Sequence, residues 1–152
     1  MLIKVKRFLL NILDFFFPLD LLAKRYPISA KGIIYQKDKV ILLKTNRNTW
    51  DLPGGKINSK ETPEVGLKRE VYEELNLEVK VGNVLDTYFL NVQGRVNVFI
   101  VIYECFLVSE ISDLQISFEH EEVNFFSLDE LEMLSINSNY KRTIKENRLI
   151  SK

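Results

Sequence analysis

The chain has 152 residues, of which 46% are hydrophobic and 28% charged, a composition typical of one globular domain and not of a disordered chain. Its 21 basic and 21 acidic side chains cancel, so it lacks the basic excess of a protein that binds nucleic acid stably. Cys105 is the only cysteine, which excludes an internal disulfide and favours a reducing, cytoplasmic location. It lies in an apolar run, so we expect a buried core thiol.

Residues 1–26 are predicted to form an amphipathic helical extension. Polar side chains trace a narrow stripe, at spacings of three and four residues, on an otherwise apolar helix: Lys4, Arg7, Asn11 and Asp14. The apolar run is too short to span a bilayer, and no small-residue cleavage site follows it. We expect residues 2–22 to pack against the domain itself, against a second copy in a homodimer, or against a membrane surface, where the basic start would help.

Residues 27–152 are predicted to form one α+β domain that begins with a hairpin and a capped helix. Two strands at 28–35 and 40–44 flank a tight turn. The helix after them has Thr62 as its N-cap, Pro63 as its first residue and Asn76 as its left-handed C-cap. Downstream we expect strands at 77–84, 87–92, 96–108 and 122–126, a helix that starts in a capping box of Ser127 and Glu130, and a C-terminal helix from Ser138 whose basic residues form a solvated face (Lys141, Arg142, Lys145 and Arg148).

Three glutamates of the capped helix, Glu70, Glu73 and Glu74, occupy positions i, i+3 and i+4 and therefore share one helical face. Like charges at these spacings repel each other, so a solvated row of surface glutamates is one interpretation. A bound divalent cation would offset this repulsion, because Mg²⁺ takes carboxylate and phosphate oxygens as ligands. Zinc fits poorly, since the cysteines and histidines that it requires are missing.

The residues around these glutamates favour the metal interpretation. Gly54 and Gly55 lie upstream, where bare backbone can approach an ion or a phosphate closely, although an ordinary tight turn is the simpler alternative. Glu61 precedes the helix and is placed to accept a hydrogen bond from Arg69, with a plain surface ion pair as the alternative. Arg69 also stands beside Glu70, where it can orient a carboxylate.

The spacing of these residues resembles the Nudix box. The matching pattern is Gly55, five residues, Glu61, seven residues, Arg69-Glu70-Val71, one residue, Glu73-Glu74, one residue, Asn76-Leu77, with Asn76 where the box has glycine. Similar flanking segments lie at 50–54, 119–122, 125–126 and 128–131. The resemblance covers the chain from about Ser29 to Leu134 and leaves the N-terminal extension outside.

The resemblance implies a Nudix-type three-layer α/β/α sandwich with a mixed sheet, formed by residues 27–152. It implies a Mg²⁺-dependent hydrolase, with Mn²⁺ as a substitute, that cleaves the diphosphate linkage of a nucleoside diphosphate derivative by attack of water at phosphorus. By analogy, metal ligands would be Glu73, Glu74, the Gly54 carbonyl and, as a further contact, Glu70, with Gly55 and Glu61 supporting the cofactor site and Arg69 orienting its carboxylates. The general base would be Glu70, Glu119 or Glu122.

Two questions stay open at the level of sequence. The domain is either this hydrolase or a catalytically inactive Nudix-like module that binds a nucleotide or a protein partner. The intact set of carboxylates favours the hydrolase. The substrate is a nucleotide-type small molecule, and nucleoside triphosphates, ADP-sugars and dinucleotides all fit. Four aromatic residues are candidates for stacking on a base or for the core: Trp50, Tyr88, Phe89 and Phe126.

Overall fold

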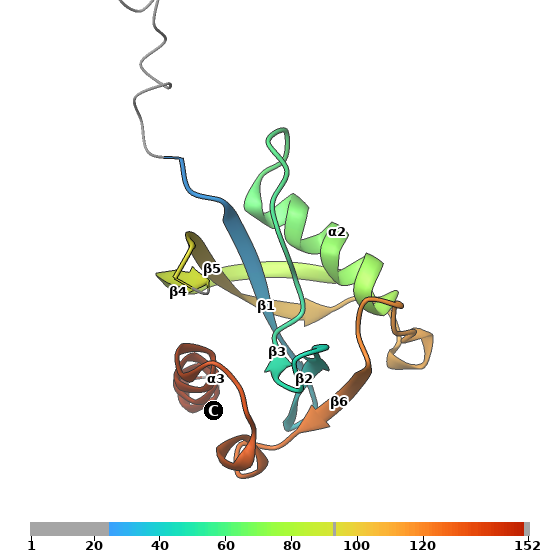
Figure 1. Ribbon diagram of the computed structural model, residues 1–152. Coiled ribbons are helices and arrows are strands. Elements are labelled where there is room, and N and C mark those ends of the chain that lie inside the picture. Colours follow the sequence, from blue (N-terminus) through green and yellow to red (C-terminus); the bar gives the residue numbers. More distant parts are fainter. Residues whose placement is uncertain (1–24, 93, 151–152) are drawn as a thin grey trace, which may run out of the picture.

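The computed structural model describes residues 25–92 and 94–150 (Figure 1). Residues 1–24 of the predicted extension lie outside the described residues, so the extension and its packing through residues 2–22 stay a prediction. The elements, in chain order, are β1 (Ile28–Gln36), β2 (Lys39–Lys44), β3 (Trp50–Asp51), α2 (Pro63–Leu75), β4 (Val79–Val92), β5 (Val96–Leu107), η2 (Ile111–Asp113), β6 (Glu122–Phe126), η3 (Glu130–Met133) and α3 (Ser138–Ile150). No helix among them is both long and apolar enough to cross a bilayer.

The strands form a mixed sheet in the order β3-β2-β1-β5-β4, with β6 also pairing with β2. β1 and β5 are parallel, from Ile28 opposite Phe99 to Ile34 opposite Cys105. The other pairs are antiparallel, and β1 meets β2 only beside their tight turn. The mixed sheet implied by the sequence is therefore confirmed.

Side chains alternate across the sheet and build two cores, one under each helix. In β1, Ala30 and Ile34 belong to the core that contains Leu67 of α2, whereas Ile33 belongs to the core that contains Ile144 of α3. All five are fully buried, and Figure 1 shows α2 and α3 on opposite sides of the strands. The three-layer α/β/α arrangement is confirmed, and α2, the helix that carries the three glutamates, packs directly against the sheet.

Cys105 is part of the core beneath α2, as predicted. Its side chain is buried, and this burial raises the pKa of its thiol to about 12. The sulfur lies where a Cβ at Gly32 would be 3.0 Å away from it, so the thiol fills space in the core.

Two predicted elements differ from the structure. The strands expected at 77–84 and 87–92 form one strand, β4. The register with β5 shifts at bulges beside Val84, but the pairing continues on both sides of them. The capping box exists, since Ser127 N donates to Glu130 Oε2 at 2.7 Å, but it starts only the 3₁₀ turn η3. The chain then becomes extended because Trp50 N donates to Ser135 O at 2.8 Å, which draws the segment to the sheet edge.

The basic residues on the solvated face of α3 also form ion pairs, and the side chain of Arg142 stays 51% exposed in its pair. Arg142 pairs with Asp86 of β4 at 2.6 Å, and Arg148 pairs with Asp38 in the turn between β1 and β2. The two lysines of this group, Lys141 and Lys145, both pair with Glu132. These basic residues therefore tie α3 to neighbouring elements, a role that depends on contacts distant in sequence.

Candidate active site

Helix α2 begins and ends at the predicted residues. The Thr62 side chain accepts a hydrogen bond from Val65 N, Pro63 is in the first turn, and Asn76 adopts the left-handed conformation with φ 55° and ψ 29°. Asparagine tolerates this conformation, so the glycine of the Nudix box is not needed to stop the helix. The Asn76 side chain also donates to Asp113 O at 2.9 Å, which fixes the end of α2 against η2.

Arg69 gathers the acidic side chains of the predicted site. Its guanidinium donates to Glu61 Oε1 at 2.6 Å and Oε2 at 3.2 Å, to Glu70 Oε1 at 2.7 Å and to Glu73 Oε2 at 3.1 Å. It donates further to Lys56 O at 3.3 Å. A planar guanidinium has enough donors to hold three carboxylates at once, which a lysine ammonium cannot do with the same geometry. Arg69 therefore fixes the orientation of Glu70 and Glu73.

Glu61 supports Arg69 from the loop before α2. One of its oxygens also accepts from Asn58 N at 2.8 Å, and the hydrogen bond from Arg69 is the main reason that its pKa falls to about 2. Gly66 makes room for it, because a Cβ there would be 2.9 Å from Glu61 Oε1. Glu61 thus stays ionised and acts on the site through Arg69.

Glu74 is the buried member of the three glutamates, with 7% of its surface exposed. Its Oε2 accepts from Gly54 N at 2.7 Å, and its Oε1 contacts His120 Nε2 at 2.9 Å. Its backbone carbonyl accepts from Ser117 N at 2.9 Å. Glu74 therefore joins three segments that are far apart in sequence: the Gly54 turn, α2 and the loop before β6.

His120 is a site residue that the sequence did not single out. The hydrogen bond with Glu74 is the main cause of its raised pKa, and burial opposes it. Its Nδ1 is buried and has no hydrogen-bond partner among the described residues. The sequence placed this histidine among the acidic residues of the loop, but nothing local indicated that it would reach a glutamate 46 positions away.

Gly54 and Gly55 both lie where a side chain would collide with the site. Gly54 has φ +117°, and a Cβ there would run into Ala30 O of β1 and come within 2.7 Å of Leu67 Cδ1. A Cβ on Gly55 would meet the Glu70 carboxyl carbon at 2.7 Å. The two glycines therefore let the backbone lie directly against β1 on one side and against the α2 carboxylates on the other.

Lys31 and Asp51 form a second feature that the sequence did not single out. The Lys31 ammonium donates to Gly54 O at 2.5 Å, to Asp51 Oδ2 at 3.0 Å and to Leu52 O at 3.1 Å. Lys31 is 8% exposed, so a buried cation lies directly on the backbone carbonyl that the resemblance assigns to the metal.

The other two candidates for the general base, Glu119 and Glu122, do not take part in this hydrogen-bond network. Glu122 starts β6 opposite Lys44 and pairs with its ammonium at 3.6 Å. Glu119 is exposed. Within the described part of the chain, neither contacts Glu70, Glu73 or Glu74 through a hydrogen bond, whereas their neighbour His120 does.

The donor set fits a hard divalent ion although the carboxylates do not yet converge. Across residues 25–92 and 94–150, no three histidine, cysteine, aspartate or glutamate side chains surround a common point, because Arg69 holds Glu70 and Glu73 while Gly54 N and His120 hold Glu74. Every candidate ligand is nevertheless oxygen, which is the chemistry of Mg²⁺ and Mn²⁺. Glu70 Oε2 accepts no hydrogen bond within the described part of the chain, so it has capacity to spare.

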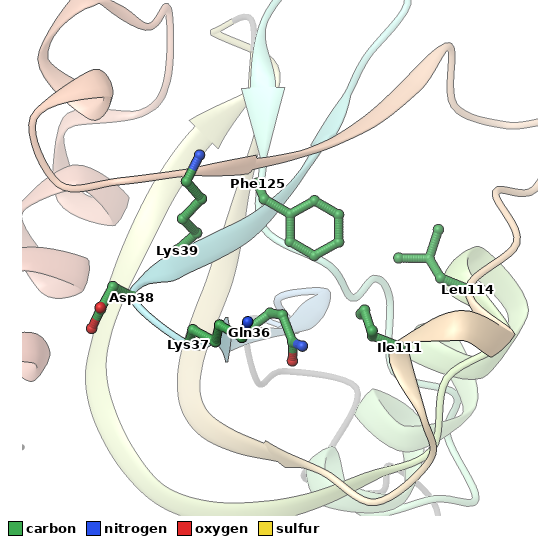
Figure 2. A pocket seen from close by; sticks show the side chains of 7 residues that line it. All are labelled: Gln36, Lys37, Asp38, Lys39, Ile111, Leu114 and Phe125. Atoms are coloured by element: carbon green, nitrogen blue, oxygen red, sulfur yellow. The ribbon is translucent and has the colours of Figure 1, made fainter.

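The surface carries several hollows, and two of them differ in polarity. One, of about 590 Å³, adjoins Asp51 and the edge of the sheet and is lined partly by Trp50, Asn137 and Tyr140. The other, of about 630 Å³, is apolar, and Figure 2 shows Phe125, Leu114 and Ile111 around it. None of the residues that line the apolar hollow belongs to the site described above, whereas the first hollow shares Asp51 with it.

The four aromatic residues that could stack on a base differ in how close they lie to the candidate site. Trp50 lines the hollow beside Asp51 and packs edge-on against Phe126, with ring centroids 4.6 Å apart. Tyr88 packs against the core beneath α3, and Phe89 is 57% exposed and packs against Phe99. Of the four, only Trp50 lies beside the candidate site.

Comparison with known proteins agrees with this geometry. Residues 25–146 match the model of the NUDIX domain, well over half of the chain. The chain belongs to the Nudix family. Over 73 residues, 47% of both proteins, it is 34% identical to a MutT-like protein of Streptomyces ambofaciens. Over 124 residues, 78% of this chain and 71% of the relative, it is 27% identical to an ADP-ribose pyrophosphatase of Methanocaldococcus jannaschii.

Other relatives match over shorter stretches. An 8-oxo-dGTP diphosphatase of Proteus vulgaris is 47% identical over 38 residues, which cover 25% of this chain and 34% of the relative. The Nudix chain thus spans less than half of the length of this protein and of the MutT-like protein.

Solved structures resemble nearly the whole described domain. A MutT protein from Methanosarcina mazei Go1 has a TM-score of 0.71 at 27% identity and covers 85% of this chain and 98% of its own. A Nudix family hydrolase from Clostridium perfringens has a TM-score of 0.73, with 85% and 100% covered, but its 19% identity shows the fold alone.

Proposed function

We propose that this Nudix chain hydrolyses the diphosphate linkage of a nucleoside diphosphate derivative, with attack of water at phosphorus. The observation that carries the proposal is the network around α2, in which Arg69 orients Glu70 and Glu73 while Glu74 holds the Gly54 turn. A domain that only binds a ligand has no need for this set of oriented carboxylates. Relatives whose names state diphosphate hydrolysis support the same reaction class.

The residues that would hold a metal ion are Glu70, Glu73, Glu74 and the Gly54 carbonyl. A bound Mg²⁺ or Mn²⁺ would supply charge neutralisation at the diphosphate and acidify an attacking water. Arg69, which Glu61 holds in place, contributes by orienting Glu70 and Glu73. Glu74, which is buried, anchors the amide of Gly54, the residue whose carbonyl would bind the metal ion.

A carboxylate must also accept the proton of the attacking water. Glu70 is the candidate that the geometry favours, because its Oε2 is unbonded within the described part of the chain while Arg69 fixes its other oxygen. Two alternatives for the general base remain: Glu119, in the loop before β6, and Glu122, the first residue of β6. Replacing each of the three with glutamine separates them, since only the loss of the true base should abolish the rise of kcat with pH.

The part of the substrate beyond the diphosphate has a candidate location. The hollow of about 590 Å³ beside Asp51 offers the ring of Trp50 and polar groups such as Asn137, a combination that suits a flat, hydrogen-bonding group such as a nucleobase. We therefore expect a nucleotide-type substrate. Relatives named as acting on ADP-ribose, 8-oxo-dGTP and diphosphoinositol polyphosphates define the first panel of compounds.

The test is a panel assay with a binding control. Each compound is incubated with the full chain and with Mg²⁺ or Mn²⁺, and released products are separated by chromatography. We expect cleavage of at least one diphosphate compound, lost on chelation and lost in Glu73→Gln and Glu74→Gln. The alternative, an inactive nucleotide-binding or interaction module, predicts heat of binding in calorimetry with no product from any compound.

A further inference from the structure

Lys31 places a positive charge where charges are rarely found, inside the sheet. Its neighbours in β1, Ala30 and Ile33, are fully buried, and Lys31 itself is 8% exposed. A buried ammonium is tolerated only when oxygen partners replace its water shell. Lys31 has three such partners: the carboxylate of Asp51 and the backbone carbonyls of Leu52 and Gly54.

This set of partners is the kind that binds a metal ion. One carboxylate and two carbonyls around a cation match the oxygen donors that Mg²⁺ and Ca²⁺ take. The shortest contact, 2.5 Å, is to Gly54 O, and the amide of the same residue is held by Glu74 at 2.7 Å. The carbonyl that the proposed metal would use is thus already bound by a cation that belongs to the protein.

An ammonium and a divalent ion on one carbonyl oxygen would lie within about 5 Å of each other. Their repulsion at that separation weakens metal binding roughly tenfold or more, even at the dielectric constant of bulk water. Asp51 pairs with Lys31 at 3.0 Å and stays in place in every Lys31 variant, so a comparison of those variants isolates the effect of the lysine charge.

We propose that Lys31 competes with the metal ion for the Gly54 carbonyl. In the metal-free protein the Lys31 ammonium occupies this carbonyl, and its charge keeps the affinity for metal low until substrate binds. The inference rests on the proposed function, because it concerns the same metal site. A diphosphate brings its own negative oxygens and so offsets the repulsion, which makes uptake of metal and of substrate mutually dependent. Lys31 therefore acts on the reaction through Gly54.

The experiment measures Mn²⁺ binding to the full-length, metal-free protein without nucleotide, by the loss of the free-ion electron paramagnetic resonance signal. Lys31→Met removes the charge, and Lys31→Gln removes it but keeps a donor for the carbonyl. Lys31→Arg keeps the charge. Lys68→Met is the matched control, because it removes a charge from an exposed position on α2. Circular dichroism checks that each variant folds.

We expect both neutral variants to bind Mn²⁺ about tenfold more tightly than the wild type, while Lys31→Arg and Lys68→Met stay within about twofold. Addition of a non-hydrolysable diphosphate analogue should tighten Mn²⁺ binding more in the wild type than in Lys31→Gln. Equal or weaker binding by the folded neutral variants would overturn the competitor role while leaving the metal site intact. Absence of Mn²⁺ binding in the wild type and all variants would contradict the proposed metal-dependent function as well.

Discussion

The two adjacent glycines give the most direct test of how the fold positions the site, because alanine at each should have opposite consequences. At Gly54, alanine must adopt φ +117° and its Cβ would collide with Ala30 O and lie 2.7 Å from Leu67 Cδ1. At Gly55 no such strain arises, and the atoms nearest to the new Cβ belong to the Glu70 carboxylate, the far end of a flexible side chain.

The cost of Gly54→Ala can be worked out from the contacts around it. Backbone strain at a positive φ costs about 1–3 kcal/mol. Relief of the collision moves the turn away from β1 and breaks the hydrogen bonds from Ala30 N to Gly55 O (3.0 Å) and from Gly32 N to Pro53 O (2.8 Å), each contributing about 1 kcal/mol. The free energy of unfolding should fall by about 3–5 kcal/mol, which lowers the Tm by about 10 °C in a chain of this size.

Gly55→Ala should leave stability almost unchanged and damage catalysis. The reduced entropy of the unfolded chain offsets the small cost of moving a side chain, so the free energy of unfolding should change by less than about 1 kcal/mol. The displaced Glu70 carboxylate should lower kcat about 100-fold, the usual effect of a misplacement of about 1 Å. Urea unfolding and turnover on the same preparations measure both quantities. Equal stability of the two variants, or full activity in Gly55→Ala, would refute this account of the turn.

Three further predictions concern single side chains. Glu74→Gln should lose turnover and also loosen the Gly54 turn, so amide exchange at Gly54 should speed up in the metal-free protein, whereas the more exposed Glu73→Gln should lose turnover without that change. The pKa of Glu61 is lowered to about 2, so its ion pair with Arg69 stabilises the fold above pH 4.5 and is lost as the pH falls toward 2; Glu61→Gln should flatten the fall in stability over that range, and an unchanged slope in urea unfolding would count against the pair. Cys105, whose pKa is raised to about 12, should react with a thiol reagent at neutral pH only after unfolding; rapid labelling of the native protein would show that the core beneath α2 opens.

Local patterns in the sequence were sufficient to predict the ends of α2, several strands and the shared face of the three glutamates. Thr62, Pro63 and Asn76 mark the ends of α2 through chemistry that involves only their immediate neighbours. Periodicity likewise located β1, β2 and β6. The face shared by Glu70, Glu73 and Glu74 followed from helical spacing. The Arg69–Glu61 contact was one of two interpretations, because Glu61 lies just before the helix that carries Arg69.

The rest of the site depends on tertiary contacts that no local pattern records. Lys31 reaches Gly54 across 23 positions because β1 is hydrogen-bonded to the Gly54 turn. His120 reaches Glu74 across 46 positions because the loop before β6 is hydrogen-bonded to the end of α2. The short 3₁₀ turn after Ser127 has the same origin, since pairing of Trp50 with Ser135 overrides the capping box. Long-range packing thus decided which charged residues entered the site.

Isotope labelling shows whether this chain catalyses attack of water on a phosphorus atom of a diphosphate. A cleavable compound from the panel is incubated with the full chain and Mg²⁺ in water enriched in ¹⁸O, and the products are weighed by mass spectrometry. We expect one ¹⁸O atom in one of the two phosphate-bearing products of the wild type, and no labelled product with Glu74→Gln. Binding of the panel compounds without labelled product, or products that carry no ¹⁸O on phosphate, would contradict this expectation.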